Sequence, residues 1–157
     1  MSRPARPGRF FTWREFERSK AAAKAGIKLR VPDHHAPAVV ALCAHVLDPV
    51  RVAIGGPVEV TSGYRTDETN RLIGGSPTSQ HKTGEAADIK GEDGEGKPIP
   101  AEDLARAIVD FADDFDQVIW YAPSRGGHVH VSYTEGRANR RQTLHAPASG
   151  GYSPWRP

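Results

Sequence analysis

Two short stretches of the sequence carry side chains that can share one metal ion. SQHKTGEAADIK places His81 seven positions before Asp88, and the later stretch GHVHVSY contains His128 and His130. Imidazole nitrogen and carboxylate oxygen are ligands that zinc takes at about 2.0–2.2 Å. Three such ligands leave the fourth position of a tetrahedral zinc ion open, which is the arrangement of a catalytic site. The two stretches together therefore offer the donors that a shared metal centre would need.

Each candidate ligand also has an ordinary structural interpretation. His81 lies in a loop rich in Gly, Ser and Thr, where exposed histidines are common, and Asp88 can be a capping or salt-bridging carboxylate. His128 and His130 can belong to a polar sheet face, because alternate residues of a strand point to the same side. Either stretch alone is weak evidence, so the elements that position them matter.

The pattern of the chain predicts an α+β fold, with N-terminal helices packed on a small, mainly antiparallel sheet that would carry the candidate zinc site. A capping box of Thr12 and Glu15 begins a helix that we expect to reach Ala25. Apolar periodicity predicts three further helices, over about 37–52, 67–74 and 100–113. Alternation and turn residues predict strands over 58–62, 85–90, 117–122 and 128–133, of which the last two form an antiparallel hairpin.

Length and composition suit one domain, since 157 residues with 38% hydrophobic content can bury a single core. We expect a basic N-terminal arm over 1–9, a domain over 10–133 that contains the candidate metal ligands, and a mobile C-terminal tail over 134–157, because the periodicity ends near Thr134. We also expect the protein to be a monomer.

The charge and apolar patterns exclude several classes of partner. The net charge is only +2 and the basic residues lie mainly near the two ends, so we expect no nucleic-acid partner. The basic ends can be either solvated arms or segments that are attracted to an anionic polymer such as a cell wall. The single Cys43 excludes an intramolecular disulfide. We expect no membrane span, and we expect synthesis in the cytoplasm without a classical signal peptide.

Several motifs, taken in order, resemble one family of enzymes. They are SGYRT (62–66), N-x3-GGS-x2-SQH-x2-GEAAD (70–88) and HVHVSY (128–133), together with FTWREFERSKAAAKAGI nearer the N-terminus. In this order and spacing they resemble the zinc D-alanyl-D-alanine carboxypeptidase family, which includes peptidoglycan endopeptidases, and in particular its members in phages and prophages. The resemblance covers about residues 10 to 133. The HVH arrangement is also similar to that of the hedgehog signalling domain.

The resemblance implies roles for individual residues. The zinc ligands of the family fall on His81, Asp88 and His130. Arg65 matches an arginine that holds a carboxylate or carbonyl of the substrate, although it can also simply close a turn by bonding carbonyls. Ser79 matches a residue that orients the loop or the substrate.

The sequence departs from the family pattern at Gly127. Many members carry an acidic residue three places before the last zinc ligand, where it acts as the general base. His128 is the nearest residue that titrates near neutral pH, so we expect it to act as the base or to stabilise the oxyanion. Glu85 is the alternative base from the opposite side of the site.

The resemblance therefore implies a zinc metallopeptidase that hydrolyses a peptide bond in the peptidoglycan stem, as a D,D-carboxypeptidase or an endolysin-type endopeptidase. Its cofactor would be Zn²⁺ and its partners stem peptides of the cell wall, reached through phage-type lysis or injection. The alternative is a catalytically inactive, zinc-stabilised module that binds the wall, because Gly127 removes the usual acid.

Overall fold

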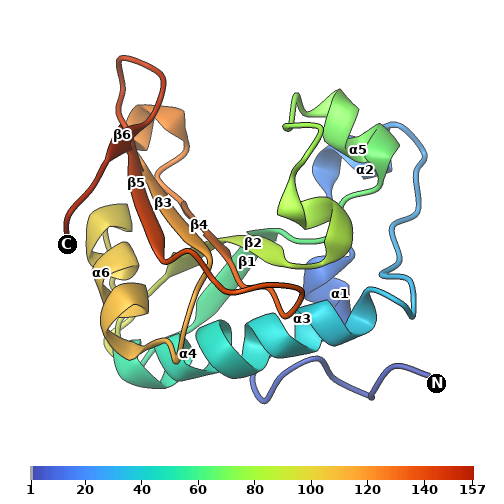
Figure 1. The fold of residues 1–157 in the computed structure, drawn as a ribbon, viewed down its shortest axis with the longest axis horizontal. Coiled ribbons are helices and arrows are strands. Elements are labelled where there is room, and N and C mark those ends of the chain that lie inside the picture. The colour runs from blue at the N-terminus through green and yellow to red at the C-terminus, as the bar shows by residue number, and fades with distance from the viewer. Residues whose placement is uncertain (1) are drawn as a thin grey trace.

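The computed structural model describes residues 2–157 and has an α+β architecture (Figure 1). One mixed sheet contains the strands in the order β1-β2-β4-β3-β5-β6. Their bounds are β1 (Val58–Ser62), β2 (Ala86–Gly91), β3 (Gln117–Tyr121), β4 (Val129–Ser132), β5 (Gln142–Ala146) and β6 (Ser153–Pro154). All neighbouring strands are antiparallel except β3 and β5, which are parallel. The α+β class and the β3–β4 hairpin are thus confirmed.

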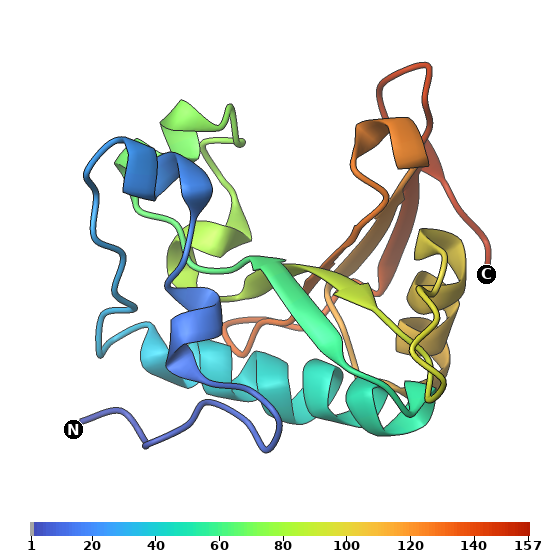
Figure 2. The same ribbon diagram turned by 180° about the vertical axis from the view of Figure 1, so that it is seen from behind.

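The helices gather around this sheet (Figure 2). Their bounds are α1 (Trp13–Phe16), α2 (Lys20–Lys24), α3 (Ala36–Leu42), α4 (Asp48–Ile54), α5 (Asp67–Leu72) and α6 (Ala101–Phe111). A π-helical segment, Cys43–Leu47, joins α3 and α4 into one continuous helix. Short 3₁₀ turns follow at Gln80–Thr83 and Pro123–Arg125. The helices expected near 37–52, 67–74 and 100–113 are therefore present.

The expected helix from Thr12 to Ala25 is instead two short helices. The capping box of Thr12 and Glu15 forms as expected and begins α1. Glu17 then ends α1, and its Oε1 accepts a hydrogen bond of 2.9 Å from the distant amide of Val31. The Ser19 hydroxyl accepts from the amide of Ala22 and begins α2. A contact between segments far apart in the sequence thus accompanies the break in the helical pattern.

The continuous helix Ala36–Ile54 supplies much of the core. By length and composition its 19 residues are apolar enough to cross a membrane. However, Val39, Val46 and Val50 belong to the same buried cluster as Ile89 of β2 and Val129 of β4. Because these apolar side chains pack inside the protein, the helix matches the core helix of a folded domain as well as it matches a membrane span.

The C-terminal segment is not the expected mobile tail. β5 pairs with β3, β6 pairs with β5, and Trp155 is buried in the main core cluster. The amide of Trp155 donates to the carbonyl of Thr143 at 3.1 Å, which ties the last residues to β5. The segment is too polar to show a period, but sheet pairing and a single aromatic anchor hold it in the fold.

Candidate metal centre

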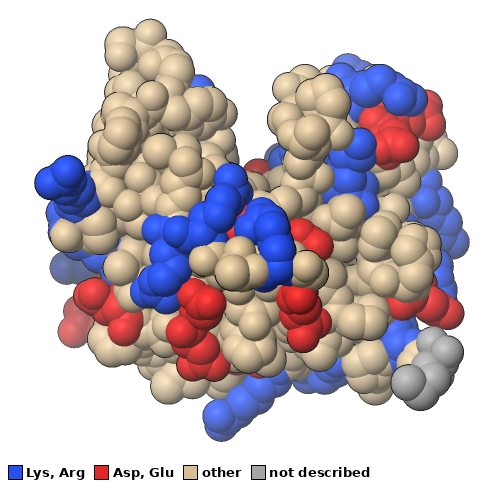
Figure 3. Space-filling view, in the orientation of Figure 1, with Lys and Arg blue, Asp and Glu red and all other residues tan. Residues whose placement is uncertain are grey.

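One row of paired residues crosses the sheet and forms the floor of a cavity. Asp88 of β2 pairs with His130 of β4, which pairs with Ile119 of β3, which in turn pairs with Leu144 of β5. Paired residues in a row point to the same face of a sheet. Figure 3 shows this face hollowed between two lobes, with Lys and Arg side chains at the lower rim of the hollow. The cavity measures about 570 Å³, within the usual range of ligand sites.

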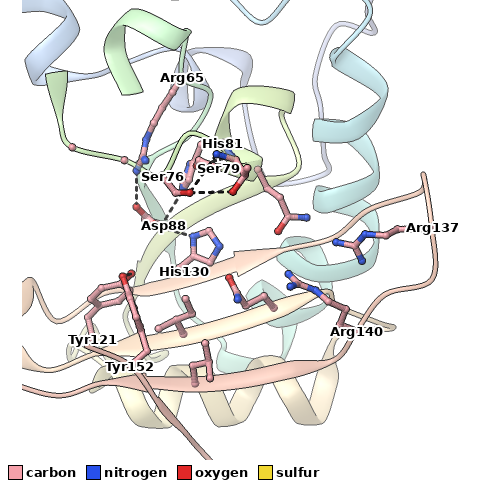
Figure 4. A pocket seen from close by; sticks show the side chains of 17 residues that line it. Arg65, Ser76, Ser79, His81, Asp88, Tyr121, His130, Arg137, Arg140 and Tyr152 are labelled. Atoms are coloured by element: carbon pink, nitrogen blue, oxygen red, sulfur yellow. Dashed lines mark hydrogen bonds and ion pairs between the residues drawn. The ribbon is translucent and has the colours of Figure 1, made fainter. Parts of the chain in front are cut away.

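Three candidate ligands meet on this floor (Figure 4). One ligand atom each from His81, Asp88 and His130 lies within 4.8 Å of the other two. Asp88 and His130 come from paired strands, and His81 comes from the 3₁₀ turn that precedes β2. The two separate stretches of the sequence thus bring their side chains to one point, as the motifs indicated.

The tautomer of His81 follows from its surroundings. Its Nδ1 lies 2.7 Å from the carbonyl oxygen of Gly63, and a carbonyl only accepts, so Nδ1 carries the hydrogen. Burial lowers the pKa of His81, although the nearby charge of Asp88 opposes this effect. In the neutral ring Nε2 therefore presents a lone pair, and it lies 3.2 Å from Oδ1 of Asp88.

Two electron-pair donors that face each other at this distance need a positive charge between them. A proton or a metal cation can supply it, and the same Asp88 oxygen lies 3.1 Å from Nδ1 of His130. Ligand atoms at about 2.0–2.2 Å from a tetrahedral zinc ion lie about 3.3–3.6 Å apart. The observed separations of 3.1 and 3.2 Å are close to that spacing. The donor set therefore fits zinc.

Asp88 is charged at neutral pH. Burial alone would raise the pKa of Asp88, but the imidazole rings of His81 and His130 beside its Oδ1 outweigh burial and hold this pKa well below its usual range. The Arg65 Nη2 donates to Oδ2 of Asp88 at 3.2 Å, on the oxygen that the histidines leave free. The carboxylate is thus oriented from both sides.

Arg65 is held by three side chains. Its Nε donates to the Ser62 hydroxyl at 3.1 Å and its Nη1 to Oδ1 of Asn70 at 3.4 Å, besides the bond to Asp88. None of these partners is a carbonyl of the main chain, so the turn-closing interpretation does not describe its contacts. Arg65 also lines the cavity. It can therefore reach a bound ligand while it positions Asp88.

Ser79 begins the turn that carries His81. Its hydroxyl accepts a hydrogen bond of 3.3 Å from the His81 amide, and the side chain lines the cavity. The expected loop-orienting role matches this contact. A contact of Ser79 with substrate stays a prediction.

The two residues expected to transfer protons lie outside the cavity lining. His128 precedes β4, and its ring stacks on that of Tyr121 with centroids 4.3 Å apart. Glu85 accepts a hydrogen bond from the Gln80 amide group at 3.2 Å. Neither side chain is among the described residues that line the cavity, whereas Tyr121 is. The catalytic role of His128 and of Glu85 stays a prediction.

The cavity is also lined by residues that lie outside the sequence motifs. Tyr121 and Tyr152 lie at one end of the cavity with their hydroxyl oxygens 3.3 Å apart, and Arg137 and Arg140 lie on the other side of His130 (Figure 4). The alternation of QVIWY, which places residues 117, 119 and 121 on one face, contains the signal for Tyr121. The two arginines belong to the basic stretch near the C-terminal end, which the sequence marked only as a charged segment and not as part of this site.

Comparison with models of known protein families gives a match. The model of a family described as Peptidase M15 matches residues 9–132. This range contains the three candidate ligands and ends at the last residue of β4, so β5 and the two arginines lie beyond it. A search of curated proteins found no match.

Proposed function

Because the chain belongs to the peptidase M15 family of zinc-dependent peptidases, we propose that it hydrolyses a peptide bond in the stem peptide of bacterial peptidoglycan. Family membership confirms the resemblance first seen in the motifs. The observation that carries the proposal is the approach of His81 Nε2 and His130 Nδ1 to one oxygen of Asp88 on the floor of a cavity. The products would be those of a D,D-carboxypeptidase or of an endolysin-type endopeptidase.

The zinc ion would be held by His81, Asp88 and His130. When bound, zinc polarises a carbonyl group and supplies a nucleophile at neutral pH. The hydrogen bond from His81 Nδ1 to the Gly63 carbonyl keeps Nε2 free to bind it, as outer-sphere hydrogen bonds do in metal sites.

In this proposal Arg65 has two tasks. It fixes the orientation of the Asp88 carboxylate through Nη2, and its position on the cavity wall lets it contact the substrate. A guanidinium suits both tasks because its donors form a rigid planar fork.

Tyr121 brings a phenol group to the cavity wall. Burial raises its pKa, and the Tyr152 hydroxyl adds to this effect, so the phenol keeps its proton at neutral pH. Such a phenol donates a hydrogen bond but does not act as a base. We therefore assign Tyr121 the role of donating to an oxygen of the substrate as negative charge develops there.

One observation favours the alternative, a zinc-stabilised module that binds the wall without cutting it. Gly127 stands where many relatives carry the general base, and Asp88 is the sole carboxylate among the described residues that line the cavity. A site without a free base would keep the metal and the fold but lose most of its activity.

Incubation of the zinc-loaded protein with purified peptidoglycan distinguishes the two functions. The released fragments are identified by mass spectrometry, and new amino groups are counted, with the variant His81→Ala as the matched control. Release of stem fragments by the wild type alone supports the peptidase and identifies the bond that is cut. Retention on the wall without new amino groups, with zinc in place, establishes the binding module instead.

We also propose that the protein acts on the cell wall after synthesis in the cytoplasm, through phage-type lysis or injection. Its membership of a peptidase family and its motif resemblance to phage enzymes support this route. Immunodetection in fractions of the producing cell tests it, because protein that reached the wall without lysis or injection would contradict it.

A further inference from the structure

A wholly buried carboxylate organises the wall of the cavity opposite Arg65. Asp116, which precedes β3, is 0% exposed and accepts hydrogen bonds from two arginines of the 134–141 loop. Arg137 Nη1 and Nη2 reach its two oxygens at 2.6 and 2.9 Å, and Arg140 adds Nη2 at 2.8 Å and its backbone amide at 3.0 Å. Burial would raise the pKa of Asp116, but these bonds outweigh it and hold the pKa far below its usual range.

One arginine would balance the charge of Asp116, yet the site contains two. These three side chains therefore carry one positive charge in excess, and Glu85, a further acidic neighbour of Arg137, does not line the cavity. The side chains of Arg137 and Arg140 are 49% and 48% exposed, so each guanidinium also faces solvent. The Nη1 of Arg140 has no hydrogen-bond partner among residues 2–157, which leaves donors free for a ligand.

Both arginines line the same cavity as the metal-ligand group. Figure 4 shows them on one side of His130, with Arg65 and Asp88 on the other side. Three arginines thus face one carboxylate, Asp88, among the described residues of the cavity lining, and Asp88 is already engaged by the two histidines. An anionic group of a ligand would meet fixed donors on the wall formed by the 134–141 loop.

We propose that Arg137 and Arg140 form a subsite for a carboxylate of the substrate that is separate from the group cleaved at the metal centre. This inference rests on the proposed peptidase function and names the substrate class: acidic stem peptides, with a free carboxylate next to the scissile region. Asp116 holds both guanidinium groups in place, so that little order is lost when the ligand binds. A peptide in which that carboxylate is an amide would lose a charge-assisted hydrogen bond.

The test uses two synthetic stem pentapeptides that differ in one group. One carries D-isoglutamate and the other D-isoglutamine, so that only the α-carboxylate changes. We expect zinc-loaded wild type to favour the acid by about tenfold in kcat/KM, since a charge-assisted bond at half-exposed side chains lies at the lower end of its range. The variants Arg137→Gln and Arg140→Gln should lower that ratio toward one.

The ratio is independent of the folded fraction of a variant, because both peptides meet the same active molecules. Arg141→Gln is the matched control, since Arg141 belongs to the same loop and pairs with Asp114 but does not line the cavity. It should keep the wild-type ratio. A ratio near one in the wild type, or a wild-type ratio in both test variants, overturns the subsite.

Failure of the proposed function gives a different result. If the zinc-loaded protein cleaves neither peptide, the peptidase proposal fails, and the subsite is decided by the Kd of each peptide in calorimetry. A roughly tenfold tighter Kd for the acid that falls in Arg140→Gln supports the subsite without catalysis. Equal Kd values for acid and amide, or no binding of either peptide, overturn it.

Discussion

Asp88 and Asp116 are both buried carboxylates beside the central sheet, but their partners differ in kind. All close partners of Asp116 are N–H donors, from Arg137, Arg140 and the backbone. Asp88 has one such donor, Arg65, and otherwise faces two imidazole rings, one of which presents a lone pair. A buried carboxylate whose neighbours are all N–H donors has its hydrogen bonds satisfied. A buried carboxylate that faces a lone pair needs a cation between the two groups.

Within one cavity, Asp116 has a structural role and Asp88 belongs to the candidate metal centre. The Asp116 side fixes two positive charges at the wall, and the Asp88 side collects ligands for a positive charge from solution. Variants at the two aspartates should therefore fail in different ways.

The largest effect is expected from Asp88→Asn. An amide can no longer offer the charged oxygen that faces both histidines, so zinc content should fall from one per chain to near zero and activity by at least about 10³-fold. Elemental analysis of the purified variant measures its zinc content, and peptide turnover measures its activity. Full zinc occupancy in this variant would remove Asp88 from the ligand set.

Arg65→Ala should have the next largest effect, a loss of about 10²-fold in kcat/KM. The change removes a donor to Asp88 and a cation from the cavity wall, and loss of an outer-sphere partner costs a metal site about 10–100-fold in affinity. Arg65→Lys should recover little, because an ammonium group lacks the planar fork. Wild-type turnover and zinc affinity in Arg65→Ala would show that the Arg65 contacts have only a local structural role.

Asp116→Asn should act on stability and leave zinc in place. It removes the charge that anchors two arginines, and because these are half exposed we expect a loss of about 2 kcal/mol rather than the larger cost of a wholly buried pair. Urea denaturation measures the difference. Asp114→Asn is the control, since Asp114 pairs with the exposed Arg141 and should change stability by less than about 0.5 kcal/mol.

Lower pH should reduce the difference in the free energy of unfolding between wild type and Asp116→Asn. The pKa of Asp116 is lower in the folded than in the unfolded chain, so the unfolded carboxylate takes up a proton first as the pH falls. The stability that the charge contributes is fully present above about pH 5 and is lost progressively below the unfolded pKa of about 3.9. A gap between the two urea midpoints that widens toward pH 3 would contradict this assignment.

The smallest effect on turnover is expected at the end of the cavity that contains Tyr121. Tyr121→Phe removes the phenol donor and should cost about tenfold in kcat/KM with zinc retained, near the lower end of what a hydrogen bond to developing charge contributes. His128→Ala loses only the stacked ring and should cost less than Tyr121→Phe. A loss of about 10²–10⁴-fold in His128→Ala would instead establish the base role expected from the sequence.

Local patterns predicted the Asp88 side of the cavity well. The alternation of Val129 and Val131 with polar residues predicted β4 and the face on which His130 lies. The Gly-rich stretch before β2 predicted the loop that carries His81. Family resemblance added the ligand assignment, which the convergence of the three side chains now supports. The positions of β4 and of the His81 loop depend on residues close together in the chain, so periodicity and motifs can predict them.

The Asp116 side could not be predicted in this way. Its contacts join residue 116 to residues 137 and 140, and the arginine-rich loop has no period of its own. β5 is parallel to β3, and a parallel pair has no hairpin turn from which the sequence could predict it. The break after α1 has the same origin, because the distant Val31 amide engages Glu17. Interactions of this kind appear only when the chain is folded.

The parallel pairing of β5 with β3 also affects how the domain can be divided. A fragment that ended at Ser132, where the family match ends, would leave one side of β3 as a free edge. Its residues Val118, Ile119 and Trp120 form an apolar run with high β-propensity, and unpaired strands of this kind recruit other chains. The 25 residues after Ser132 therefore cover this edge of β3, and Arg137, Arg140, Leu144 and Tyr152 among them also line the cavity.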